Sequence, residues 1–123
     1  MKTFTRKQLM GLATSAVIAF VPVAAFAHGQ LESAVPAAGS TVDTPDTLRL
    51  TFNEDLESAF STVKVTDANG TAVSKEKAKV DATNPRVLTI AVPKLSSGSY
   101  SVQWAVMTHD SHKTKGAYGF QVK

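Results

Sequence analysis

The segment 108–112 reads Thr-His-Asp-Ser-His and gathers side chains that could bind a metal ion. Asp110 and His112 are separated by one residue, and they follow a run of alternating apolar residues. If that strand continues, the two side chains lie on the same side, about 7 Å apart along it, and His109 points to the other side. Imidazole and carboxylate groups both bind divalent transition metals. Taken alone, the pair leaves open a metal site and an ordinary surface loop.

A further histidine, His28, directly follows a segment typical of a secretory signal peptide. Residues 1–27 begin with a basic head, continue as an apolar run and end in Ala-Phe-Ala, a small-x-small cleavage pattern. The alternative is a membrane anchor, since the run is near the ~18–20 residues that a spanning helix needs. Pro22 and the immediate onset of polar sequence favour cleavage. We therefore expect a signal peptide at 1–27 and a periplasmic domain at 28–123, without membrane insertion after cleavage.

Cleavage at this point would turn His28 into a chelating residue. A histidine at the amino terminus carries an amine and an imidazole, and both can bind one ion in a six-membered chelate through Nδ1. The imidazole of His112 and the carboxylate of Asp110 would complete a set of three nitrogens and one oxygen. Tetragonal ligation of this kind suits Cu(II), and zinc in a tetrahedral site is the competing interpretation. The lack of cysteine and of clustered methionine argues against a Cu(I) site.

Charge and composition exclude several other functions. The net charge is +3, from 13 basic and 10 acidic residues, but three of the basic residues lie in 1–27. Residues 28–123 therefore carry equal numbers of each sign, with no basic stripe for a nucleic-acid partner. Disulfides and thiolate sites are excluded because the chain has no cysteine. The nucleophile-elbow, Walker and dinucleotide-binding motifs are also missing from the sequence.

The rest of the chain predicts an all-β fold. Apolar residues alternate with polar ones in five runs, at 47–52, 62–67, 86–92, 99–106 and 117–122. This period of two is typical of strands that bury one face, and turn residues such as Asn69-Gly70 separate the runs. About seven short strands in one domain indicate a small Greek-key β-barrel or sandwich. We expect Trp104, the only tryptophan, to anchor its core.

Three blocks of sequence together resemble the CopC-type periplasmic copper-binding proteins, which include the YobA-like proteins. The blocks are HGQLESAVPAAGSTV from residue 28, LRLTFNEDLE from residue 48 and YSVQWAVMTHDSHKTKGAYGFQV from residue 100. The resemblance covers essentially all of 28–123 and implies a Greek-key β-barrel of cupredoxin or immunoglobulin-like type. It also implies a Cu(II) site at His28, Asp110 and His112. Glu54 is implied as a fourth ligand or as a residue that orients a ligand.

The sequence departs from the family pattern at three positions. Met107 is the only methionine after residue 27, so the methionine-rich Cu(I) site of some members is not expected, and we expect Met107 to pack at the core or its edge. Ser111 stands where glycine is usual between the aspartate and the histidine, so an unusual backbone angle is expected there. His109 replaces a small residue, and is either a solvated neighbour or a ligand for a second, weaker ion.

The favoured interpretation is a non-enzymatic, monomeric protein that sequesters copper or delivers it to an inner-membrane copper permease. One alternative is an oxidative enzyme, because polysaccharide monooxygenases also bind copper through an amino-terminal histidine and a second histidine. A carboxylate ligand argues against it, since that ligand stabilises Cu(II) and hinders redox cycling. The other alternative is a β-sandwich interaction module without metal affinity.

Overall fold

The computed structural model describes residues 30–123, which form eight strands and one 3₁₀ turn. The predicted signal peptide and His28 lie outside these residues. The elements in chain order are β1 (Leu31–Val35), β2 (Thr41–Val42), β3 (Thr47–Phe52), η1 (Ser58–Phe60), β4 (Thr62–Asp67), β5 (Lys79–Asp81), β6 (Asn84–Ala91), β7 (Gly98–Met107) and β8 (Lys113–Val122). No helix in this part of the chain has the length and apolar character needed to cross a membrane.

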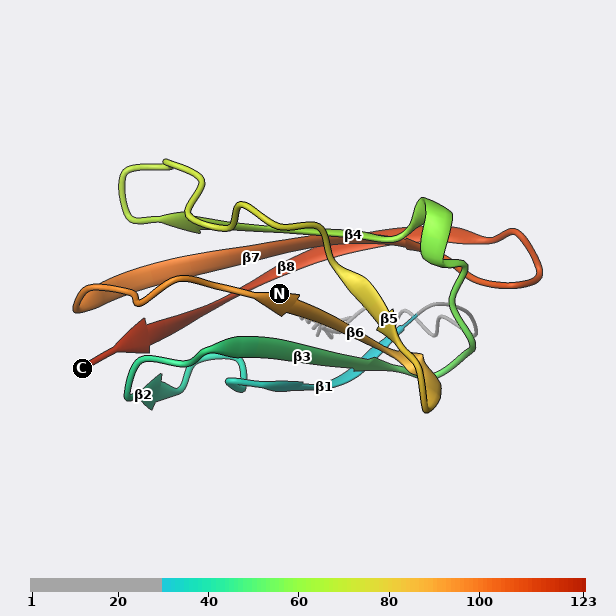
Figure 1. Ribbon diagram of the computed structural model, residues 1–123, viewed down its shortest axis with the longest axis horizontal. Helices are drawn as coiled ribbons and strands as arrows, with labels where there is room; N and C mark the ends of the chain where they lie inside the picture. The colour runs from blue at the N-terminus through green and yellow to red at the C-terminus, as the bar shows by residue number, and fades with distance from the viewer. Residues whose placement is uncertain (1–29) are drawn as a thin grey trace, which may run out of the picture.

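The strands form two four-stranded sheets that pack face to face (Figure 1). One sheet has the order β1-β3-β6-β5 and the other β2-β8-β7-β4. All pairings are antiparallel except that of β2 with β8. The all-β fold expected from the sequence is therefore confirmed.

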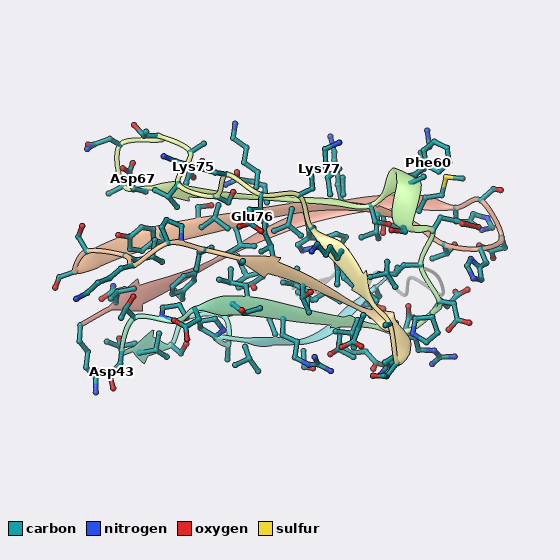
Figure 2. All side chains as sticks on the ribbon, in the orientation of Figure 1. Asp43, Phe60, Asp67, Lys75, Glu76 and Lys77 are labelled. Atoms are coloured by element: carbon teal, nitrogen blue, oxygen red, sulfur yellow. The ribbon has the colours of Figure 1, made fainter. Side chains whose placement is uncertain are left out.

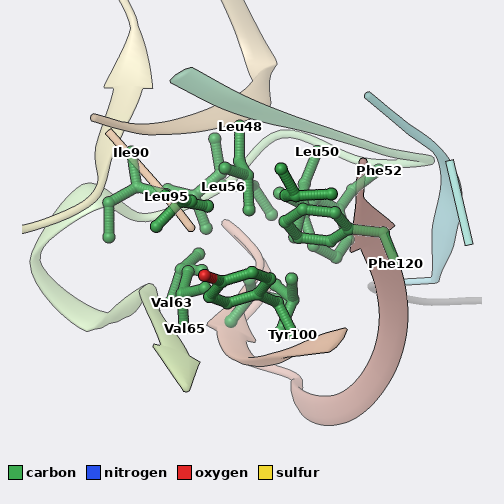
Figure 3. Packing of buried hydrophobic residues seen from close by; sticks show 14 residues of the cluster. Leu48, Leu50, Phe52, Leu56, Val63, Val65, Ile90, Leu95, Tyr100 and Phe120 are labelled. Atoms are coloured by element: carbon green, nitrogen blue, oxygen red, sulfur yellow. The ribbon is translucent and has the colours of Figure 1, made fainter. Parts of the chain in front are cut away.

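The predicted alternation places the core between the sheets, as Figure 3 shows. Leu48, Leu50 and Phe52 of β3 are fully buried, whereas the intervening Arg49 is exposed. Burying a side chain of leucine size stabilises a protein by about 1.5–3 kcal/mol. The facing sheet contributes the other half of the core, with Val63, Val65, Tyr100, Val102, Val106, Phe120 and Val122.

Trp104 joins the two sheets, as expected, although it is only partly buried. Its ring meets that of Phe52 edge to face, with centroids 5.1 Å apart and planes inclined at 74°. Gly116 is the β8 partner of Trp104, and it leaves the space that the indole fills. A Cβ atom on residue 116 would lie 2.5 Å from Cζ2 of Trp104.

Two turn predictions are confirmed. A backbone hydrogen bond from Gly70 to Asp67 closes the predicted turn at Asn69-Gly70, and Gly70 has a φ of 82°. Ser111 has a φ of 71°, the left-handed conformation that glycine adopts most readily.

We expect Gly116→Ala to destabilise the protein by about 1–3 kcal/mol, because the added methyl group must displace the Trp104 ring. Urea unfolding followed by far-UV circular dichroism measures this change. Ala117→Ser, at an exposed neighbouring position of β8, is the matched control and should stay within about 0.5 kcal/mol of the original. Equal stability of the two variants would show that the indole does not need this space.

Candidate metal centre

The segment that holds Asp110 and His112 is a tight turn between β7 and β8. The 7 Å spacing considered from the sequence applies only if the strand continues through residue 112, and this condition is not met. β7 ends at Met107, and the backbone then turns through a hydrogen bond from the Ser111 N–H to the carbonyl of Thr108. The Thr108 N–H donates in turn to the carbonyl of His112, 3.0 Å away.

The turn brings the two predicted ligands into direct contact. Nδ1 of His112 lies 3.0 Å from Oδ1 of Asp110, much closer than the 7 Å spacing that a continuous strand would give. Both side chains remain accessible, with exposed fractions of 56% for His112 and 43% for Asp110. The pair is therefore positioned by the backbone while it stays open to an ion from solution.

Thr108 fixes the carboxylate of the pair, a role that the sequence analysis missed. Its side chain is fully buried, and its hydroxyl donates a hydrogen bond to Oδ1 of Asp110. This bond, followed by the one from His112, lowers the pKa of Asp110 from 3.8 to about 2. The carboxylate is thus charged at all physiological pH values. The available signal was the strand alternation, which places Thr108 on the buried side two residues before Asp110.

His109 lies against a different segment. Its Nδ1 is 3.1 Å from Oε1 of Glu57, and its backbone N–H donates to the carbonyl of Asp55. An isolated antiparallel β-bridge pairs Leu56 with Thr108, and it joins the same segment to the turn. His109 therefore stands apart from the contact between Asp110 and His112.

The segment 53–57 also connects the turn to the beginning of the described chain. The Gln30 N–H donates to Oδ1 of Asn53 over 2.9 Å, and the Asn53 N–H donates to the carbonyl of Gln30 over 3.0 Å. At the other end of the segment, the Glu57 N–H donates to the carbonyl of Met107. Glu54 lies within the segment and is half-buried. Figure 1 shows this segment and the β7–β8 turn at the same end of the molecule.

Among residues 30–123, no three histidine, aspartate or glutamate side chains gather closely enough to hold a metal ion. The described part of the chain therefore brings together two of the candidate ligands, Asp110 and His112. Glu54 has interactions of its own, and His28 lies outside the described residues.

Comparison with known proteins gives consistent matches. The CopC domain matches residues 31–123. Protein YobA of Escherichia coli strain K12 is 35% identical over 100 residues, covering 80% of this chain and 81% of that protein. Copper resistance protein C of Escherichia coli is 34% identical over 118 residues, covering 89% and 93%. The crystal structure of CopC from Methylosinus trichosporium OB3b superposes with a TM-score of 0.74 at 37% identity, covering 78% and 94%.

We expect Thr108→Val, which keeps the side-chain shape, to raise the pKa of Asp110 from about 2 toward 3.8. A lowered pKa in the folded state stabilises the fold above pH 3.8, and this stabilisation is lost as the pH falls through about 2. The variant should therefore lose less stability than the original protein between pH 4 and pH 2. Carboxyl-carbon NMR measures the pKa, and the exposed Thr62→Val is the control. An unchanged Asp110 titration in Thr108→Val would contradict the assigned cause.

Proposed function

The chain belongs to the CopC family, and from that premise we propose that it binds Cu(II) through Asp110, His112 and the amino-terminal His28. The observation that carries the proposal is the 3.0 Å contact between the imidazole of His112 and the carboxylate of Asp110. Two atoms bound about 2.0–2.1 Å from one ion at right angles are themselves about 2.9 Å apart. An ion that displaces the Nδ1 proton of His112 would therefore find the two atoms spaced for neighbouring positions in a tetragonal copper complex.

The beginning of the described chain supports the contribution of His28. Gln30 is held to Asn53 by two hydrogen bonds, and the segment 53–57 is joined to the turn by backbone hydrogen bonds. We propose that His28, two residues before Gln30, reaches this end of the molecule, because two residues of extended chain span at most about 7 Å. Its amine becomes available only if the chain is cut after Ala27. Signal cleavage would thus create a nitrogen ligand.

Glu54 has a secondary place in this proposal. It lies one residue after Asn53, on the segment between Gln30 and the turn. A carboxylate in this position serves either as an additional oxygen ligand or as an acceptor that orients the terminal histidine. In both cases, the negative charge of the Glu54 carboxylate favours the binding of a cation.

A protein that chelates copper on a rigid β scaffold is suited to copper handling rather than to catalysis. We propose that the protein works in the periplasm as a monomer, and that it sequesters copper or passes it to an inner-membrane permease. The carboxylate ligand favours this carrier function over a copper oxidative enzyme, because charge from Asp110 stabilises the oxidised ion. Reduction by ascorbate with oxygen-dependent cleavage of a polysaccharide would instead favour the enzyme.

We expect His112→Ala to weaken Cu(II) binding by at least about 100-fold, because it removes one nitrogen ligand. Isothermal titration with a competing chelator measures the affinity. His109→Ala is the matched control, since His109 has the same exposed fraction of 56% but contacts Glu57. The control should bind Cu(II) within about threefold of the original protein. Equal losses in the two variants would contradict the assigned ligand set.

A further inference from the structure

The outer face of β4, β7 and β8 has features of a protein-docking surface. The register places Thr62 of β4 opposite Ala105 of β7, and Ala105 opposite Lys115 of β8. These three residues are exposed and form a row across the sheet. Two shallow hollows, of ≈ 530 and ≈ 490 Å³, adjoin along this row and share all three residues.

Positive charge is concentrated on this face. Lys64 and Lys115 line the first hollow, and Lys113 and Lys115 line the second. All three lysines are exposed, and none of the residues that line either hollow is acidic. None of these lysines takes part in an ion pair with another residue of 30–123. Residues 28–123 carry no net charge, so this face has a local excess of positive charge.

An exposed aromatic ring lies at the edge of the same face. Phe60 lines the second hollow and has an exposed fraction of 60%. Figure 2 shows it at the outer margin of the molecule, at the end of η1 and away from the sheet that contains β3. Its backbone is held in place, because its N–H donates to the carbonyl of Glu57. The Ser61 hydroxyl donates to that same carbonyl and accepts from the Met107 N–H.

We propose that this face docks an acidic protein segment, in which carboxylates flank an apolar side chain. The carboxylates would pair with Lys64, Lys113 and Lys115, and the apolar side chain would lie against Phe60. Such a polar, charged rim around an apolar contact is typical of protein interfaces. A lipid surface fits less well, because binding to a bilayer uses several protruding apolar side chains and this face has one.

The face begins next to the candidate metal centre. Lys113 directly follows His112 in the chain, and Met107 directly precedes the turn. A segment seated on this face would therefore lie beside the end of the molecule that contains Asp110 and His112. The proposed docking goes beyond copper binding, and it does not need a bound ion.

The test is an NMR titration of the isotope-labelled, metal-free protein with a synthetic peptide in which two glutamates stand on each side of a leucine. We expect saturable shift changes at Phe60, Thr62, Ala105 and Lys115. Lys64→Glu together with Lys115→Glu should weaken binding at least about tenfold, because two favourable contacts become repulsive. Phe60→Ser should weaken it about threefold or more.

Matched controls separate this surface from general attraction between charges. Lys79→Glu with Lys94→Glu makes the same charge change at exposed positions outside the three strands, and Val35→Ser removes an exposed apolar side chain from β1. Both should bind the peptide within about twofold of the original protein. The proposal is overturned if the control pair loses as much affinity, or if the shift changes lie elsewhere. It is also overturned if phosphatidylglycerol vesicles perturb these residues and the peptide does not.

Discussion

The antiparallel pairing of β7 with β8 is the constraint on which the rest of the structure depends. It runs without a register shift from Gly98 opposite Val122 to Met107 opposite Lys113. Because side chains alternate along both strands, the same pairing supplies core residues on one face and the exposed lysines on the other. It also fixes where the two strands must turn. The contact between Asp110 and His112 follows from that turn, because five residues join the paired ends.

Hydrogen bonds of Thr108 hold the turn between β7 and β8 in place. Thr108 is buried at the end of the sandwich, where its backbone N–H bonds to the carbonyl of His112 and its hydroxyl bonds to Asp110. A buried donor needs a partner, and here the partner is the carboxylate of the candidate site. Thr108, which is buried at this end of the sandwich, therefore also holds the carboxylate of the candidate site. Ser111, between Asp110 and His112, has a left-handed backbone conformation.

The sequence was sufficient for the fold and it named candidate ligands, but it did not give the arrangement of Asp110 and His112. Alternation in 47–52 and 99–106 predicted the buried faces correctly, because half-buried strands impose a period of two. The same reasoning left open whether the strand continues to residue 112, since alternation alone does not reveal where a strand turns. The resemblance to the family pointed to an unusual angle at Ser111, which the structure confirms. Alternation places Thr108 on the buried side, but its hydrogen bond to Asp110 depends on how the chain turns after Met107, which alternation does not give.

The most direct test of the central claim uses two versions of the protein, one that begins at His28 and one with a single alanine added before it. Cu(II) titration and electron paramagnetic resonance of both report on the terminal amine. The account predicts that the added alanine weakens Cu(II) binding by at least about tenfold and changes the nitrogen hyperfine pattern, because the amine no longer forms a six-membered chelate with the imidazole. Equal affinity with an unchanged spectrum would contradict the account.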